Sequence, residues 1–258
     1  MTDHAFHRMA LLAGADAMKT MAETHVIVFG LGGVGSWCAE ALARSGIGRI
    51  SIVDSDTVCV TNINRQVQAV RANIGEFKSE ALKKRIFDIN PGCAVTALGR
   101  VFSRDTAGDF EIHKADYVID AIDSLSNKLD LIEITTGLGV RIFSSMGMAQ
   151  KLDPSLLKAA DIWETNGCPL ARLVRAGLRK RGFAGNFTVV YSEERIPLRA
   201  DAEPACGTPQ CFCPSRGSCA AEGVEWCSSK KVINGSAVTV TATAGMILAS
   251  LVIRSVCG

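Results

Sequence analysis

Apolar and polar positions along the chain follow two alternating periods, and this alternation predicts a succession of strands and helices. The run at residues 25–30 is rich in β-branched residues and ends in glycine, which is typical of a buried parallel strand. The same reading predicts strands at 25–30, 49–54, 93–98, 116–123 and 140–147, and helices at 34–45, 75–90 and from 124 to about 137. Strands and helices that alternate in this way predict an α/β fold with a doubly wound, Rossmann-like, mostly parallel sheet.

The pattern changes after residue 152, where a C-terminal extension begins. We expect a helix at 170–180 and a strand at 187–192, and a stretch rich in Pro, Gly and Cys runs from 197 to 229. The segment 236–253 carries no charge but contains three Thr and two Ser, and it barely reaches the length of a membrane span. We therefore expect a buried strand and helix there, and no membrane partner.

Composition excludes several classes of protein. The 258 residues are 48% apolar and 21% charged, which excludes a disordered, collagen-like or coiled-coil chain. The formal net charge of +2 excludes a wholly basic nucleic-acid coat. Residues 1–21 lack the features of a signal peptide, so the ten cysteines are expected to be thiols or metal ligands in a cytoplasmic protein.

A glycine-rich loop at 30–35 lies between a predicted strand and a predicted helix. Its sequence GLGGVG supplies Gly30, Gly32, Gly33 and Gly35, and in this context the backbone amides and the helix N-terminus can approach a phosphate. Asp54 closes the second strand, where a carboxylate can accept hydrogen bonds from ribose hydroxyls. Taken alone, these residues favour an NAD enzyme.

The residues that follow argue for a nucleoside triphosphate. A polar cluster and two charged residues are expected at the same edge of the sheet, namely Asn62, Asn64, Arg65, Gln66, Lys78 and Asp123. An Arg and a Lys at one phosphate site suit a triphosphate, because they neutralise the charge of the leaving pyrophosphate. The carboxylate of Asp123 suits a Mg²⁺ ion that bridges the phosphates. A hydride-transfer enzyme needs no such set of cations and is the weakest alternative.

Several segments resemble a known family. The sequences GLGGVGSWCAEALARSGIG, VDSDTVCVTNINRQ and VIDAID are similar to the ATP-binding core of the ubiquitin-activating-type adenylyltransferases, which include the sulfur-carrier activators of molybdopterin and thiamine synthesis. GVGSWCAEALARSGIG, NINRQ and DIWETNGCPLARLVRAGLRKRG resemble the bacterial tRNA threonylcarbamoyladenosine dehydratase branch. The resemblance extends from about residue 6 to 256. One departure is the Cys168-Pro169 pair, where the branch usually has Asp-Pro.

The resemblance implies an enzyme that adenylylates a carboxylate with ATP and Mg²⁺. It implies that backbone around Gly33 holds phosphates and that Asp54 binds the ribose. It also implies that Asn64, Arg65 and Lys78 hold the triphosphate, with Asp123 at the metal and the α-phosphate. Arg8 matches an N-terminal arginine that reaches the partner subunit's ATP in homodimers of this family, so a homodimer is implied.

At the level of the branch, the resemblance implies the ATP-dependent dehydration, with ring closure, of threonylcarbamoyladenosine beside the tRNA anticodon. We accordingly expect a single domain over residues 1–258. Residues 1–152 would form the ATP-binding half, and residues 153–258 would form the half that faces the tRNA substrate.

A basic segment at 168–192 supplies a candidate RNA contact. It contains five cations and no acid, whereas the rest of the chain is weakly acidic. The cations are Arg172, Arg175, Arg179, Lys180 and Arg181. The first three recur on one helical face, with Leu170, Leu173, Val174 and Leu178 expected largely on the other. Such a stripe can follow an RNA backbone, or it can be a solvated cationic face.

Five cysteines gather in the loop at 206–227, and their role stays open. They are Cys206, Cys211, Cys213, Cys219 and Cys227. Their spacings are not paired C-x-x-C motifs, so a structural metal, free or redox-active thiols and a nucleophile are all alternatives. No catalytic cysteine is assigned.

Two other functions remain as alternatives to tRNA dehydration. One is adenylylation of the C-terminus of a ubiquitin-like sulfur carrier, and the other is a non-catalytic nucleotide or redox sensor. A sulfur-transfer partner is also left open.

Overall fold

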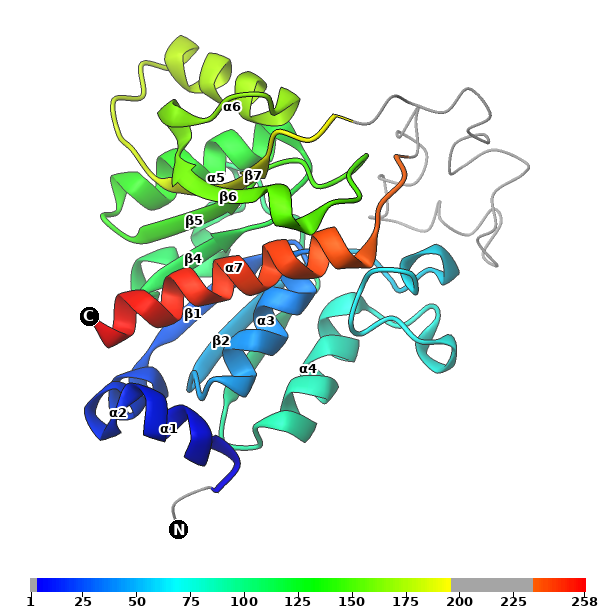
Figure 1. Ribbon diagram of the computed structural model, residues 1–258, viewed down its shortest axis with the longest axis vertical. Helices are drawn as coiled ribbons and strands as arrows, with labels where there is room; N and C mark the ends of the chain where they lie inside the picture. The colour runs from blue at the N-terminus through cyan, green and yellow to red at the C-terminus, as the bar shows by residue number, and fades with distance from the viewer. Residues whose placement is uncertain (1–3, 196–233) are drawn as a thin grey trace.

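The computed structural model describes residues 4–195 and 234–258, and its centre is a seven-stranded sheet with the order β3-β2-β1-β4-β5-β7-β6 (Figure 1). The strands are β1 (His25–Phe29), β2 (Arg49–Val53), β3 (Ala94–Leu98), β4 (Tyr117–Asp120), β5 (Arg141–Ser145), β6 (Leu157–Asp161) and β7 (Thr188–Ser192). Every pairing is parallel except that of β6 with β7. The predicted doubly wound, mostly parallel fold is therefore confirmed.

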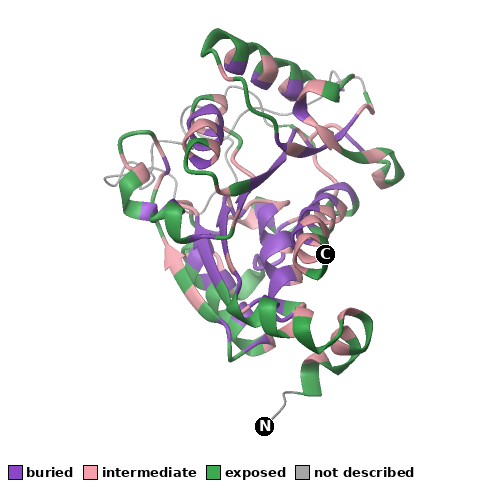
Figure 2. Ribbon diagram, turned by 90° about the vertical axis from the view of Figure 1, so that its left-hand side faces the viewer, coloured by how far each residue is buried: buried purple, intermediate pink, exposed green. Residues whose placement is uncertain are grey.

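Helices cover both faces of this sheet. They are α1 (His7–Ala13), α2 (Ala15–Glu23), α3 (Gly35–Arg44), α4 (Lys78–Ile89), α5 (Leu125–Gly137), α6 (Pro169–Lys180) and α7 (Val238–Cys257). Alternate residues of β1 enter different layers: Val26 and Val28 pack with α3, α4 and α7, whereas Ile27 and Phe29 pack with α5 and α6. Both faces of the strand are thus buried, as its unbroken β-branched sequence predicts, and Figure 2 shows burial concentrated in the sheet and on the inner sides of the helices.

The segment 236–253 is the clearest correction to the sequence analysis. It contains no strand: Val238–Cys257 form the single helix α7, which lies along α3 and across the sheet (Figure 1). Packing overrides the β-propensity of its Val and Thr residues, because Gly245 allows the backbones of the two helices to approach closely. A Cβ at Gly245 would lie 2.5 Å from the carbonyl oxygen of Val34.

Length and composition alone would allow α7 to cross a membrane. In the structure, one side of the helix is buried in the core, through Val240, Thr241, Ala244, Gly245, Leu248, Ala249 and Val252. This is the burial pattern of a core helix that packs on a sheet.

Two smaller differences concern element boundaries near the site. Strand β4 ends at Asp120, so Asp123 lies in the following loop instead of ending the strand. Helix α4 begins at Lys78 instead of residue 75, because Phe77 pairs with Thr57 in an isolated β-bridge just before it. Both changes leave Lys78 and Asp123 beyond the carboxyl ends of strands.

Candidate nucleotide-binding site

The glycine loop connects β1 to α3 in a conformation that requires its glycines. Gly30 has φ 86°, and a Cβ there would lie 2.6 Å from the carbonyl oxygen of Ala121. A Cβ at Gly35 would lie 1.9 Å from the carbonyl oxygen of Gly30. Larger residues are therefore excluded, and the loop closes directly onto the N-terminus of α3, where backbone N–H groups and the helix dipole favour an anion.

Asp54 lies immediately after β2 and is tied to the glycine loop. Its carboxylate accepts hydrogen bonds from the backbone N–H of Leu31 at 2.7 Å and of Asp56 at 2.9 Å. These contacts fix the side chain at the carboxyl ends of β1 and β2, next to the switch point between β1 and β4, where nucleotides bind in doubly wound folds.

Lys78 enters the same region from the first turn of α4. Its Nζ is 2.7 Å from a carboxylate oxygen of Asp56 and 3.8 Å from one of Asp54, and the side chain is only 7% exposed. Burial alone would lower the pKa of Lys78, but the two carboxylates outweigh it and raise the pKa. Lys78 is therefore a preorganised ammonium group beside the glycine loop.

Arg65 covers the glycine loop from the other side. Its Cγ lies 3.2 Å from the position that a Cβ on Gly33 would take, and Thr241 of α7 lies 3.1 Å from the same point. The guanidinium donates to the backbone carbonyl of Thr61 and to the side chain of Asn64, both at 2.9 Å. Burial lowers the pKa of Arg65, although an arginine keeps its charge in proteins. A phosphate on the loop would meet this cation.

The remaining amides of the cluster hold the loop at 59–68 in shape. Asn62 is buried and accepts from the backbone N–H of Cys59 at 3.0 Å, whereas Asn64 donates to the backbone carbonyl of Ser236 at 2.9 Å. Gln66 is also buried. Asn64 thus links this loop to the segment that leads into α7.

Asp123 lies in an exposed position on the loop between β4 and α5. This loop adjoins the glycine loop, because Gly30 packs against the backbone of Ala121 and Ile122. Carboxylate oxygen is a preferred ligand of Mg²⁺, which is commonly held by one or two carboxylates together with water and substrate phosphates. Within residues 4–195 and 234–258, no group of three or more His, Cys, Asp or Glu side chains is placed to bind a metal.

A fully buried ion pair supports the Asp123 loop, and the sequence analysis did not find it. Lys128 of α5 donates to Asp120 at 2.6 Å and to the backbone carbonyl of Ser145 at 3.0 Å. Asp120 also accepts from the backbone N–H of Ile122 at 3.1 Å. The only signal in the sequence is a lysine on an otherwise apolar helix face. Asp56 was missed too, although it follows Asp54 by two residues.

Four of the five predicted RNA contacts lie on α6, away from the glycine loop, and the fifth, Arg181, directly follows this helix (Figure 1). Arg172 and Lys180 are exposed, and Arg179 lies over the Trp163 ring at 5.2 Å. Arg175 donates to the Thr165 hydroxyl and is half-buried. The buried face of α6 consists of Ala171, Val174 and Leu178, whereas Leu173, expected on the apolar side, is 48% exposed.

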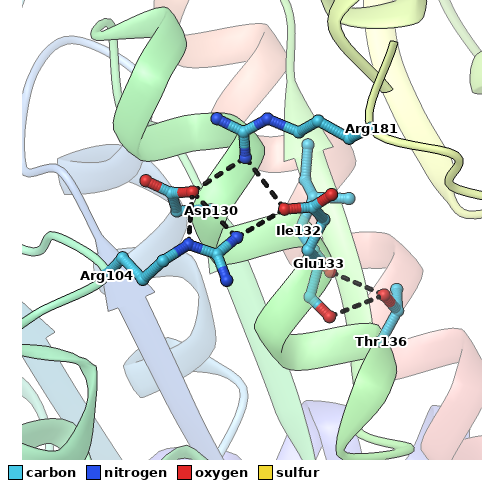
Figure 3. Close-up of polar contacts among 6 residues, drawn as sticks. All are labelled: Arg104, Asp130, Ile132, Glu133, Thr136 and Arg181. Atoms are coloured by element: carbon cyan, nitrogen blue, oxygen red, sulfur yellow. Dashed lines mark hydrogen bonds and ion pairs between the residues drawn. The ribbon is translucent and has the colours of Figure 1, made fainter. Parts of the chain in front are cut away.

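Arg181 takes part in a network of ion pairs that joins α6 to α5. It donates to Asp130 at 2.7 Å and to Glu133 at 2.8 Å, and Arg104 pairs with the same two carboxylates (Figure 3). Two arginines thus share two acids of α5. The guanidinium of Arg181 is therefore engaged in ion pairs within the protein, unlike that of Arg172 on the exposed side of α6.

Of the other predicted residues, Arg8 lies away from the glycine loop, and the cysteine loop is not among the described residues. Arg8 is exposed on α1, which packs near the far end of α3, where Phe6 contacts Gly46. It therefore cannot reach the glycine loop of its own chain. The predicted cysteine loop at 206–227 lies outside the described residues, as do all five of its cysteines.

A cavity of about 640 Å³ opens at the amino ends of β5 and β7. Its lining includes Arg141, Phe187 and Arg254. It is at the opposite edge of the sheet from the glycine loop, so it is not the nucleotide site.

These features define a nucleotide-binding α/β protein: a glycine loop at a helix N-terminus, an acid after β2, and a lysine and an arginine beside the phosphate position. Comparison with known proteins then identifies its family. The model of the ThiF family matches residues 6–258, and the chain belongs to that family. The resemblance noted from the sequence motifs is therefore confirmed.

Several relatives are named for the same activity. The chain is 41% identical over 208 residues to a Bacillus subtilis protein called tRNA threonylcarbamoyladenosine dehydratase, with 80% of this chain and 82% of the relative covered. The crystal structure of the E. coli tRNA N6-threonylcarbamoyladenosine dehydratase in complex with AMP has a TM-score of 0.82 at 33% identity and covers 98% of this chain and 94% of that chain. The same E. coli protein was crystallised with ATP, with a TM-score of 0.80 at 32% identity, 98% of this chain and 93% of that chain being covered.

Proposed function

We propose that this protein dehydrates threonylcarbamoyladenosine in tRNA by adenylylating its carboxylate with ATP. The observation that carries the proposal is the similarity to dehydratases over nearly the whole chain, including the E. coli protein crystallised with ATP and with AMP. The geometry agrees with it, because a glycine loop flanked by Lys78 and Arg65 suits a triphosphate better than a dinucleotide.

In the first step, the substrate carboxylate attacks the α-phosphorus of ATP, which forms an acyl-adenylate and releases pyrophosphate. Lys78 and Arg65 stabilise the negative charge that develops on the leaving group, while Asp54 holds the ribose. Both cations are ordered before ATP arrives, Lys78 by Asp56 and Arg65 by Asn64, so little reorganisation is needed. Asp123 would hold a Mg²⁺ ion, which supplies further charge neutralisation when bound.

In the second step, a nucleophile of the same modified side chain attacks the activated carbonyl. A ring closes, AMP leaves, and the substrate has lost one water. Intramolecular attack has a high effective molarity, so the protein needs only to hold the adenylate in position. No cysteine is required for this step.

The proposal also covers the partners of the protein, namely a second protomer and the tRNA. Arg8 is exposed at the far edge of its own chain, so a role at ATP requires a second protomer, and a homodimer in the cytoplasm is proposed. The exposed cations of α6 are proposed to contact the tRNA backbone.

The test is mass spectrometry of nucleosides from threonylcarbamoyl-modified tRNA incubated with the protein, Mg²⁺ and ATP. We expect an ATP-dependent loss of one water from the modified adenosine. No mass change, together with pyrophosphate exchange that a small protein ending in Gly-Gly stimulates, would instead indicate activation of a sulfur carrier. Nucleotide binding without turnover in either assay would indicate a sensor.

A further inference from the structure

An aromatic side chain at the edge of the nucleotide site has no role in the mechanism described above. Phe77 directly precedes Lys78, and 49% of its surface is exposed. Single exposed apolar side chains are common on protein surfaces, so an isolated exposed ring needs no explanation by itself. The position of this ring relative to Asp54 is what makes it informative.

Three contacts place Phe77 beside the ribose position. Phe77 forms the β-bridge with Thr57, three residues after Asp54. The backbone N–H of Asp54 donates to the carbonyl of Leu98 at 3.1 Å, which joins the ends of β2 and β3. The Phe77 ring then lies over the next residue, Gly99, with Cδ1 3.8 Å from the position that a Cβ would occupy.

The direction of the nucleotide follows from the site already described. Phosphates bind at the glycine loop between β1 and α3, and the ribose binds at Asp54 after β2. The base must therefore extend away from the glycine loop, over the ends of β2 and β3. This is the area that Phe77 and Gly99 occupy, and Gly99 leaves room above the strand end because it has no side chain.

We propose that Phe77 stacks on the adenine base of ATP. The inference rests on the proposed function, since it takes ATP as the nucleotide and Asp54 as its ribose contact. An aromatic face binds any base by stacking, so Phe77 would add affinity for the nucleoside part without selecting among bases. The ring would contribute nothing to binding of the phosphates.

The experiment separates the base from the phosphates. Binding of ATP and of tripolyphosphate, both with Mg²⁺, is measured by calorimetry for the wild type, Phe77→Ala, Phe77→Tyr and Phe87→Ala. Phe87 is the matched control, because it is 61% exposed and lies near the other end of the same helix. We expect Phe77→Ala to weaken ATP binding about tenfold or more, with tripolyphosphate binding changed less than about twofold. Phe77→Tyr should restore ATP binding, and Phe87→Ala should have no effect.

Two results would overturn the inference while leaving the proposed function intact. One is unchanged ATP affinity in Phe77→Ala when Lys78→Met abolishes binding. The other is an equal loss of ATP and tripolyphosphate binding, which would indicate damage to the start of α4. Failure of the wild type to bind ATP would instead overturn the proposed function, and this inference with it.

Discussion

Lys78 shows how single residues set the chemistry of this site. Its ammonium lies between Asp54 and Asp56, so the cation is held in place without substrate. The sequence places Lys78 near the phosphates, but only the structure shows which carboxylates hold it, because Asp56 comes from a loop whose path depends on the β-bridge between Thr57 and Phe77.

Replacement of Lys78 by Met is expected to slow adenylate formation by about 10²–10³, because one preorganised charge is lost from the leaving-group side. ATP–pyrophosphate exchange measures this step. The control is Lys84→Met on the same helix, whose exposed side chain pairs with Glu76 and should leave the rate within twofold. Equal rates in the wild type and the Lys78 variant would refute the role assigned to this lysine.

Replacement of Asp123 by Ala is expected to abolish adenylate formation while the protein keeps its melting temperature. The residue is exposed on a loop, and the supporting ion pair between Asp120 and Lys128 remains in the variant. Pyrophosphate release and thermal unfolding are measured together, with Asp109→Ala as the control. Near-normal pyrophosphate release would remove Asp123 from the mechanism.

Among the elements, the parallel strands were predictable, whereas the last helix was predicted only in part, because a strand was expected before it. Buried parallel strands are continuous apolar runs, and those of β1, β2 and β4 can be recognised from the sequence alone. The short edge strand β6 lacks such a run, and α7 owes its helical state to the close packing of Gly245 on α3. Gly245 and the residues of α3 that it contacts lie about 200 residues apart in the sequence, so a local pattern of apolar positions does not show that they pack together.

The substitution Gly245→Ala tests this packing. Its new Cβ would lie 2.5 Å from the carbonyl oxygen of Val34 and 2.9 Å from the backbone nitrogen of Cys38, so α3 and α7 must separate. We expect the free energy of unfolding to fall by about 1–3 kcal/mol. Gly137→Ala at the end of α5 meets nothing within 4 Å and should not destabilise the protein. Chemical denaturation gives both values, and equal stability would contradict the packing argument.

Gly177 on α6 has a related explanation. From the sequence it is only a helix-weakening residue, but in the structure a Cβ there would lie 2.5 Å from a terminal methyl of Leu129. The glycine lets α6 lie close against α5. The ion pairs of Arg181 then join the same two helices, which is why a residue that looked like an RNA contact has a structural partner.

If α6 follows the tRNA backbone, Arg172→Gln should weaken tRNA binding and reduce the slope of log K against log salt by about 1. ATP affinity should not change, because α6 does not contribute to the glycine loop. Arg100→Gln, an exposed arginine paired with Asp109, is the control. An unchanged salt dependence would mean that this side of α6 is a solvated surface.

The stability of the whole molecule is expected to fall at acid pH, because the carboxylate of Glu40 joins two helices. Glu40 of α3 pairs with Arg44 at 2.8 Å and with Arg85 of α4. Burial alone would raise the pKa of Glu40, but the hydrogen bonds and charges of the two arginines outweigh it and lower the pKa. The native state therefore holds the ionised form more strongly than the unfolded state does.

Because the pKa of Glu40 is lower in the native state, its contribution to stability is fully present above pH 4.5 and is lost as the pH falls through the native pKa. We expect Glu40→Gln to lower stability at pH 7 and to reduce the loss of stability on acidification. Urea unfolding between pH 3 and pH 7 checks this. A variant whose pH dependence matches the wild type would show that Glu40 does not titrate differently on folding.

The place of α7 in the chain also matters for biosynthesis. This helix follows every strand, yet it packs on α3 near the start of the fold and brings Thr241 against Gly33. Until α7 has been translated, the side of α3 on which Gly245 packs lacks this partner. The glycine loop gains the contact with Thr241 only when α7 has emerged, so this side of the nucleotide site is completed about 200 residues after the loop itself has been made.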